Sequence, residues 1–359
     1  MKRLVWIRTA PPDAPGSMAA YAELVRRAVA PFADGWEFTV CDLFDPRGGG
    51  SMWRHHLWRL RHARRILASH PADLYHWLDG SMAAFMPPAL RSRSVATVHD
   101  LIPLLQWRGE LPGKPSWPAG WLIRRGVEAL RGCAALCADS AATRDDLTRL
   151  AGIAERVAVV PVPLRPLPPP RPVPVAGLPS NARFILHVGH NAAYKNRAGV
   201  VDAFARLGDV PDLHLVLVGP PPTSELRARS AALANVHFVG PVDDAALHDL
   251  YRRAALFLFP SLYEGYGMPV LEAMAAGCPV VCSTAPALVE VAGEAVLCAP
   301  AEDADALAGQ CRRLLADVRL RREQIARGLA RAAAFDVATM GWSLLEWYNN
   351  VLERMKNHG

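Results

Sequence analysis

The stretch LFLFPSLYEGYGMPVLEAMAAGCPVV, residues 256–281, joins a strand, a loop and a helix in direct succession. The apolar run 256–259 predicts a buried strand. Residues 269–276 predict a helix, which Gly277 and Pro279 end. Strand, loop and helix in this order form the repeating unit of parallel α/β sheets.

Two carboxylates bracket the start of this helix. Glu264 lies on the loop, and we expect Glu272 on the first helical turn, where the helix dipole favours a carboxylate by about 0.3–1 kcal/mol. Pro269 suits the first helical position, and Gly265 and Gly267 let a ligand approach the backbone. Free amides at such a helix start accept phosphate, and the carboxylates accept hydrogen bonds from hydroxyl groups. A sugar nucleotide has this layout; the alternative is that both acids serve only capping and solvation.

Short apolar runs alternate with helical stretches along both halves of the chain. The predicted strands are 4–7, 38–41, 74–77, 95–98, 135–138 and 157–160, then 184–188, 213–218, 236–239, 256–259 and 280–282. This alternation predicts an α/β protein with parallel sheets and helices on both faces. Two Rossmann-like domains facing a central cleft are the most economical architecture.

A proline-rich segment divides the two patterns. Nine prolines lie between Pro161 and Pro179, and they exclude a helix or a central strand. We interpret the segment as a semi-rigid linker, with a ligand for another protein's proline-recognition module as the alternative. The predicted division is 1–165 for an N-terminal domain, 166–180 for the linker, 181–335 for a C-terminal domain and 336–359 for a final helix.

Composition and charge narrow the function classes. The chain of 359 residues is 51% hydrophobic, which suffices for two cores, and it has no run of about 20 apolar residues that could span a membrane. Its seven scattered cysteines predict reduced thiols in a cytoplasmic protein. Residues 1–165 carry a net charge of +7 and residues 166–359 carry −1. No nucleic-acid-binding motif accompanies the basic half, so we expect no nucleic acid partner.

The helix predicted over residues 53–70 is basic and amphipathic. Trp53, Leu57, Leu60 and Leu67 lie near one face, and no acid occurs between residues 47 and 72. Such a helix can lie on an anionic membrane, or its apolar stripe can pack on the sheet. Both interpretations stay open.

Three further residues occupy positions where ligands bind. Lys195 follows the strand 184–188 at a probable helix start and could neutralise a diphosphate, although a loop lysine is usually only solvated. His99 lies at the carboxyl end of a strand, where open α/β sheets bind ligands; a structural role or a His-Asp metal phosphohydrolase is the alternative. Gly16 lets the backbone approach a phosphate. There is no Gly-x-Gly-x-x-Gly in this region, so neither NAD nor FAD is expected.

Residues 260–279 closely resemble the Glu-x7-Glu motif of the family 4 retaining glycosyltransferases, the glycosyl transferases group 1. The Pro-Ser, Glu-Gly-x-Gly and Glu-Ala-Met-Ala-x-Gly-x-Pro parts are all present. The resemblance is strong from about 184 to 296 and weaker over the first domain. It implies a GT-B fold, with the donor in the second domain, the acceptor entering from the first, and the final helix crossing back to the first domain.

The resemblance also implies roles for individual residues. Glu264 would contact the donor sugar, Lys195 would stabilise the charge of the leaving group, and His99 would face the donor sugar. The implied donor-binding residues are Gly16, His190, Lys195, Gly265, Tyr266, Gly267, Met268 and Glu272, the last accepting hydrogen bonds from the ribose. Many family members carry an arginine where this chain has His190, and Arg197 is the candidate to compensate.

The activity implied is transfer of a sugar, with retention, from GDP-mannose or a UDP-sugar to a saccharide or lipid-linked acceptor in polysaccharide or glycoconjugate biosynthesis. No metal or other cofactor is expected, and the implied location is the cytoplasm or the inner face of the membrane. The alternatives are a non-catalytic protein that binds sugar nucleotides, and an epimerase or phosphorylase on the same fold.

Overall fold

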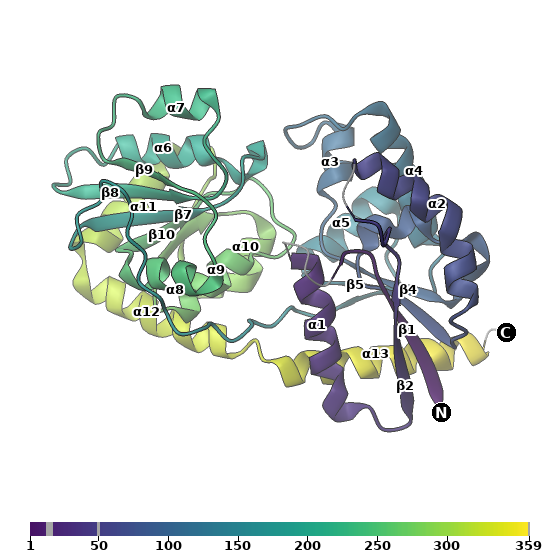
Figure 1. Ribbon diagram of the computed structural model, residues 1–359. Helices are drawn as coiled ribbons and strands as arrows, with labels where there is room; N and C mark the ends of the chain where they lie inside the picture. Colours follow the sequence, from purple (N-terminus) through teal and green to yellow (C-terminus); the bar gives the residue numbers. More distant parts are fainter. Residues whose placement is uncertain (12–16, 49–50, 358–359) are drawn as a thin grey trace. The chain divides into compact units, whose positions relative to one another are not determined.

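The computed structural model describes residues 1–11, 17–48 and 51–357, without the side chains of residues 17–19. The chain divides into two compact units. The first comprises Met1–Glu110, Lys114–Pro163 and Asp336–Gly359, and the second comprises Leu111–Gly113 and Leu164–Phe335. Each unit contains one parallel six-stranded sheet with helices packed on it (Figure 1). The predicted class, α/β with two Rossmann-like domains, is confirmed.

The sheet of the first unit has the strand order β2-β1-β3-β4-β5-β6. Its strands are β1 (Lys2–Arg8), β2 (Trp36–Asp42), β3 (Leu74–Trp77), β4 (Ser94–Val98), β5 (Ala135–Ala138) and β6 (Val157–Val159). Its helices are α1 (Ser17–Val29), η1 (Ala30–Phe32), α2 (Met52–Ala68), η2 (Gly80–Phe85), η3 (Pro88–Arg93), α3 (Ile102–Arg108), α4 (Trp117–Arg131), α5 (Ala141–Ala151) and α13 (Val337–Asn357), where η denotes a 3₁₀ helix.

The sheet of the second unit has the order β12-β11-β10-β7-β8-β9. Its strands are β7 (Arg183–Val188), β8 (Leu213–Val218), β9 (Val236–Val239), β10 (Leu256–Phe259), β11 (Val280–Ser283) and β12 (Leu297–Ala299). Its helices are η4 (Ala193–Lys195), α6 (Arg197–Ala205), α7 (Ser224–Ser230), α8 (Asp244–Arg253), α9 (Met268–Ala275), α10 (Pro286–Ala292), η5 (Gly293–Ala295), α11 (Ala304–Ala316) and α12 (Val318–Ala333). The sequence did not predict β12.

Strand order determines where each unit can bind a ligand. In the second unit the chain adds β8 and β9 on one side of β7, and then β10, β11 and β12 on the other. The order therefore reverses between β7 and β10, and ligands of open α/β sheets bind outside the carboxyl ends of the strands at such a point. The corresponding reversal in the first unit lies between β1 and β3.

The final helix α13 belongs to the first unit and packs against α1. Its Tyr348 hydroxyl lies 2.6 Å from Nδ1 of His76 on β3 and accepts a hydrogen bond of 3.3 Å from the Trp6 indole on β1. Tyr348 and His76 are fully buried. Burial lowers the pKa of His76 to about 3, so its ring is neutral in this position. The helix is thus attached to the middle of the sheet through a buried polar contact.

Helix α2 does not bury the face that the sequence suggested. Its inward residues are His56, Arg59, Ala63 and Leu67. Arg59 donates hydrogen bonds to the carbonyl oxygens of Thr9 and Leu43, which allows a guanidinium to replace apolar packing there. Of the predicted apolar stripe only Leu67 is in the core, and the remaining residues, Trp53, Leu57 and Leu60, lie on the surface.

The proline-rich segment lies along α8 of the second unit. Arg171 donates its backbone amide to the carbonyl oxygen of Ala245 and its guanidinium to Asp243. His248 Nδ1 lies 2.7 Å from the carbonyl oxygen of Pro168, and Arg253 donates to that of Val173. Residues 164–176 are therefore part of a folded unit.

Gly341 is the position at which the α1–α13 contact can be tested. A Cβ added there would lie 1.9 Å from the carbonyl oxygen of Ala28, so Gly341→Ala must displace one helix. We expect a loss of about 1–3 kcal/mol in the free energy of unfolding, measured by urea denaturation.

Gly309→Ala is the matched control, because a Cβ at this helical position on α11 meets nothing within 4 Å. It should be neutral or stabilise by up to about 1 kcal/mol. Equal stabilities of the two variants would contradict the close packing of α13 on α1.

Candidate functional site

Two loops meet at the point where the strand order of the second unit reverses. One follows β7 and carries His190 and Lys195, and the other follows β10 and carries Glu264. The backbone amide of Leu262 donates to the carbonyl oxygen of Tyr194 at 2.7 Å, which ties the loops together. Pairing of β7 with β10 thus brings together two residues that lie 69 positions apart in the chain.

Lys195 and Glu264 form an ion pair in this position. The ammonium nitrogen lies 2.7 Å and 2.9 Å from the two carboxylate oxygens. The side chains are only 12% and 9% exposed, and the Lys195 nitrogen also lies 5.2 Å from the ring centroid of Phe259. Removing either charge of such a pair is destabilising, because the other charge would then be buried without compensation.

Asn196 fixes the loop that presents Lys195. Its φ of 51° lies in the left-handed region, which asparagine tolerates better than most residues. Its side-chain amide donates to the carbonyl oxygens of Pro260 and Ala301, and its Oδ1 accepts from the amide of Gly199 at the start of α6. The residue therefore caps a helix and joins it to the end of β10.

The helix start after Glu264 is built on Gly267. This residue has a φ of +117° and precedes Met268, the first residue of α9. A side chain is strained at this φ, and a Cβ would also lie 2.6 Å from a methyl carbon of Leu288, so the position favours glycine. Pro269 occupies the second helical position, one later than predicted. Tyr266 is buried and meets the ring of Phe335 edge-on.

Glu272 is one position further along α9 than predicted, which takes it out of the first turn. No acid occupies the first turn of this helix, so the expected dipole stabilisation of Glu272 is wrong. The carboxylate accepts a hydrogen bond of 3.3 Å from the hydroxyl of Tyr251, which lies on α8. Burial raises the pKa of Glu272 to about 7, and the nearby positive charge of Arg165 opposes this shift.

His190 and Arg197 are both engaged within the second unit. Nδ1 of His190 accepts a hydrogen bond from the amide of Ala192, and Nε2 lies 3.1 Å from the hydroxyl of Tyr194. Burial and the charge of Lys195 lower the pKa of His190, so it does not supply the charge of an arginine. Arg197 is buried and donates to the side chain of Asn191 and to the carbonyl oxygen of Pro220.

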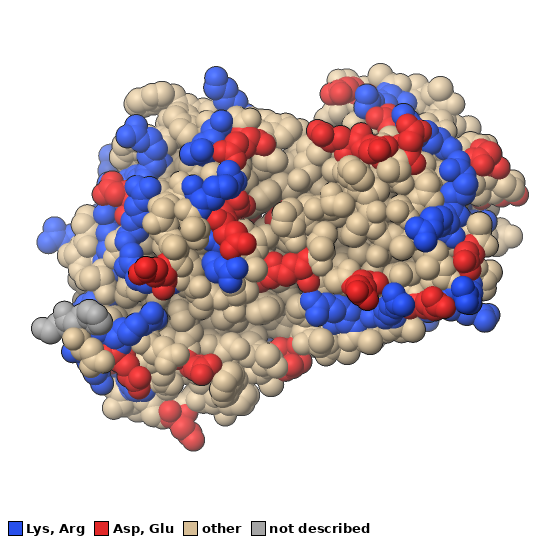
Figure 2. Space-filling model, turned by 180° about the vertical axis from the view of Figure 1, so that it is seen from behind, with Lys and Arg blue, Asp and Glu red and all other residues tan. Residues whose placement is uncertain are grey.

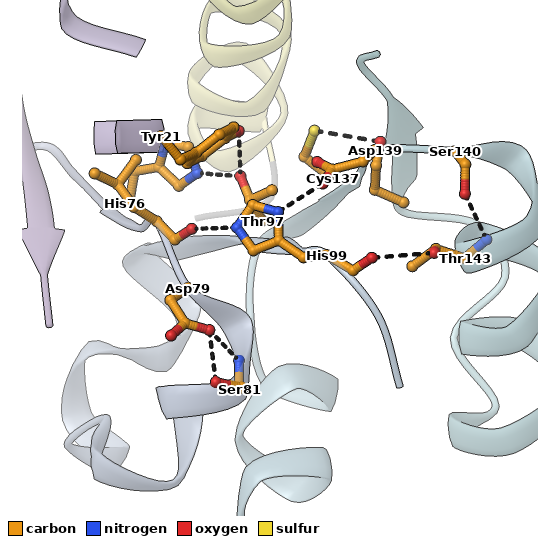
Figure 3. Close-up of polar contacts among 12 residues, drawn as sticks. Tyr21, His76, Asp79, Ser81, Thr97, His99, Cys137, Asp139, Ser140 and Thr143 are labelled. Atoms are coloured by element: carbon orange, nitrogen blue, oxygen red, sulfur yellow. Dashed lines mark hydrogen bonds and ion pairs between the residues drawn. The ribbon is translucent and has the colours of Figure 1, made fainter. Parts of the chain in front are cut away.

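The remaining predicted residues belong to the first unit. Gly16 lies outside the described residues. His99 follows β4, and its ring lies between Asp139, which follows β5, and the carbonyl oxygen of Leu78, which follows β3 (Figure 3). These distances are 2.6 Å from Nδ1 to the carboxylate and 2.9 Å from Nε2 to the carbonyl.

Three polar residues of these sites were not predicted as site residues from the sequence: Asn196, Tyr251 and Asp139. Asn196 had a recognisable signal, since asparagine before a helix is a common cap. Tyr251 and Asp139 had none, because their partners lie 21 and 40 positions away.

Two family models match the chain. One, described as Glycosyl transferases group 1, covers residues 173–331, and the other, described as Glycosyltransferase Family 4, covers residues 28–164.

Curated relatives and a solved structure show further similarity. The chain is 36% identical over 159 residues to O-antigen chain mannosyltransferase B of Escherichia coli, covering 42% of each chain. It is 32% identical over 181 residues to phosphatidyl-myo-inositol mannosyltransferase of Mycolicibacterium smegmatis, covering 49% of this chain and 47% of the relative. These matches span about half the length of each relative or less. Sucrose-phosphate synthase from Thermosynechococcus elongatus shares the fold at a TM-score of 0.78 and 21% identity, over 99% of this chain and 100% of the other.

Glu272 makes stability depend on pH. Its pKa in the folded protein, about 7, lies above its ordinary value of 4.5. Its contribution to stability is therefore fully present below pH 4.5 and is lost as the pH rises through 7. Glu272→Gln should gain about 2 kcal/mol relative to the wild type between roughly pH 5 and pH 8 in urea unfolding.

The control for this measurement is Glu323→Gln, at an exposed position on α12. This variant shows the effect of the same substitution at a surface position. A stability difference for Glu272→Gln that does not change between pH 5 and pH 8 would show that the Glu272 carboxyl is not perturbed by burial.

Proposed function

Because the chain belongs to family 4 of the glycosyltransferases, the glycosyl transferases group 1, we propose that it is a retaining glycosyltransferase. It would transfer a sugar from a nucleoside-diphosphate sugar to a saccharide or lipid-linked acceptor. The Lys195–Glu264 ion pair carries this proposal, since it places opposite charges at the point of the sheet where a ligand binds.

Each charge of the pair suits one part of such a donor. The carboxylate of Glu264 can accept hydrogen bonds from sugar hydroxyl groups, and the Lys195 ammonium can pair with the diphosphate. The amides of residues 265–268 precede or begin α9, where an anion is favoured. Glu272 would accept hydrogen bonds from the ribose, with Tyr251 holding its carboxylate in place.

The reaction that follows needs no protein nucleophile. The bond between the anomeric carbon and the diphosphate oxygen breaks, and the acceptor oxygen bonds to that carbon on the same face of the sugar. The acceptor proton passes to a phosphate oxygen of the donor. Lys195 and the helix-start amides would stabilise the diphosphate charge electrostatically, which is why we propose a reaction independent of divalent metal ions.

GDP-mannose is the first donor to test. Two relatives of this chain are named as mannosyltransferases, and neither name specifies the donor nucleotide. UDP-sugars are the second choice. The binding test therefore has to compare donors with different nucleotide bases.

A lipid-linked acceptor would require contact with a membrane surface. Helices α2 and α4 both pack on η2, and Leu57 and Trp117 are 51% and 78% exposed. The exposed arginines of α2 are Arg54, Arg61, Arg64 and Arg65. Figure 2, the view from behind, shows basic side chains over the first unit, at the left, with acidic side chains among them. Exposed tryptophan and leucine beside arginine suit an anionic lipid surface, and we propose peripheral binding there.

None of the described helices combines the length and apolar character needed to cross a membrane.

Two other activities fit parts of the same site. A non-catalytic protein would bind the sugar nucleotide without turnover, which the uncharged His190 favours. An epimerase or phosphorylase would form product without an acceptor or with phosphate in its place.

The first experiment is thermal stabilisation by GDP-, UDP-, ADP- and dTDP-sugars in the presence of EDTA, followed by transfer assays with the responding donor. A ligand at about 100 times its Kd should stabilise by about 2.7 kcal/mol. Glu264→Gln should reduce transfer at least about 100-fold while the protein stays folded, and Glu323→Gln should retain full activity. Full turnover in Glu264→Gln, or no response to any donor, would overturn the proposal.

The membrane contact is tested by co-sedimentation with vesicles of mixed phosphatidylglycerol and phosphatidylcholine. Leu57→Ser combined with Trp117→Ser should weaken binding at least about tenfold, because both exposed apolar side chains are removed. Val289→Ser, at an exposed position in the second unit, is the control and should bind like the wild type. Equal binding by all three proteins would refute this surface.

A further inference from the structure

His99 is held by acceptors on both sides of its ring. Nδ1 lies 2.6 Å from Oδ2 of Asp139, and Nε2 lies 2.9 Å from the carbonyl oxygen of Leu78. A carbonyl oxygen can only accept, and an ionised carboxylate can only accept as well. Both ring nitrogens must then carry hydrogen, so this geometry suits the imidazolium form.

The contact with His99 is the one hydrogen bond that the Asp139 carboxylate makes in the described contacts. The residue is 4% exposed, and its other oxygen, Oδ1, is buried without a hydrogen-bond partner among the described residues. A buried carboxylate is costly unless a charge compensates it, and the imidazolium is its only close cation in the described contacts. Figure 3 shows the His99 ring directed toward Asp139, and the strands that the two residues follow, β4 and β5, are neighbours in the sheet.

The titratable groups around His99 come from four elements. Asp139 follows β5, Asp79 precedes η2, His76 lies on β3, and the Tyr21 ring of α1 meets the His99 ring edge-on at 4.6 Å. Burial opposes the positive charge, but the charge and hydrogen bond of Asp139, with a smaller contribution from Asp79, raise the pKa of His99 to about 9. His76 is neutral, so it adds no competing charge.

We propose that Asp139 is a positioning residue that holds His99 as a permanent imidazolium, so that His99 serves the transfer reaction as a fixed positive charge and not as a proton donor or acceptor. The inference rests on the proposed glycosyl transfer. The histidine is the more exposed partner, 15% against 5%, so the pair presents its positive end outward at the carboxyl edge of the sheet. A fixed cation there favours a negatively charged group on a substrate that binds at this edge of the first sheet.

The variant that tests this is Asp139→Asn. The asparagine amide can donate to an unprotonated Nδ1 while Nε2 still donates to Leu78, so a neutral histidine keeps the same geometry. In ¹⁵N-histidine NMR of the full chain, with His99→Gln to assign the signal, the wild-type His99 should titrate near pH 9. In Asp139→Asn the burial that lowers the pKa of His99 remains while the carboxylate is gone, so His99 should titrate at or below its ordinary value of 6.5.

The rate of sugar transfer should depend on the fraction of His99 that is protonated. With the wild-type midpoint near 9 and a variant midpoint at or below 6.5, Asp139→Asn should transfer sugar at least about 30-fold more slowly than the wild type at pH 8, and the ratio should be smaller at pH 6. Asp79→Asn removes the other nearby carboxylate and should leave both the His99 titration and the activity ratio nearly unchanged.

Three results would overturn the inference. One is titration of wild-type His99 below about pH 7, which needs no variant and would show that the ring is neutral at pH 8. Another is an activity ratio for Asp139→Asn that is equal at both pH values. The third is an Asp79→Asn protein that behaves like Asp139→Asn. Absence of sugar transfer in the wild type would instead contradict the proposed function, and with it the role of the His99 charge in transfer. The NMR titration would still show whether Asp139 holds His99 as an imidazolium.

Discussion

Parallel pairing of β7 with β10 is the constraint from which the candidate site follows. All strands of the sheet point the same way, so the loops after these two strands emerge side by side. That adjacency lets Lys195 reach Glu264 and lets Asn196 bond to the end of β10. The ion pair is therefore a product of strand order, and each loop depends on the other for its shape.

The two units handle charge in a similar way. Each buries an ion pair just beyond the carboxyl ends of its strands, Lys195–Glu264 in one and His99–Asp139 in the other. In both pairs the cation is the more exposed member and the acid lies deeper. A carboxylate behind a cation fixes the position of the positive charge, which suits recognition of anionic substrates without mobile lysine or arginine side chains.

Apolar runs predicted eleven of the twelve strands in the described residues, because a strand buried on both faces reads as an uninterrupted apolar stretch. The Glu264 loop was equally predictable, since its glycines and the following proline are local signals. Glu272 was placed wrongly on its helix, because Gly267 allows α9 to begin at Met268. Burial of Arg59 and the pairing of Asp139 depend on carbonyl and ring positions from distant parts of the chain, which no local pattern records.

The position of α13 has a consequence for synthesis of the protein. Residues 164–335 form the second unit without help from the final helix, whereas the first unit is completed only by α13, through Tyr348 and its contact with His76. A ribosome makes the chain from the amino terminus. The first sheet therefore lacks one of its helices until the whole second unit has been synthesised. The unit synthesised first is therefore the last to finish folding, and its uncovered face is where a chaperone would find exposed apolar surface.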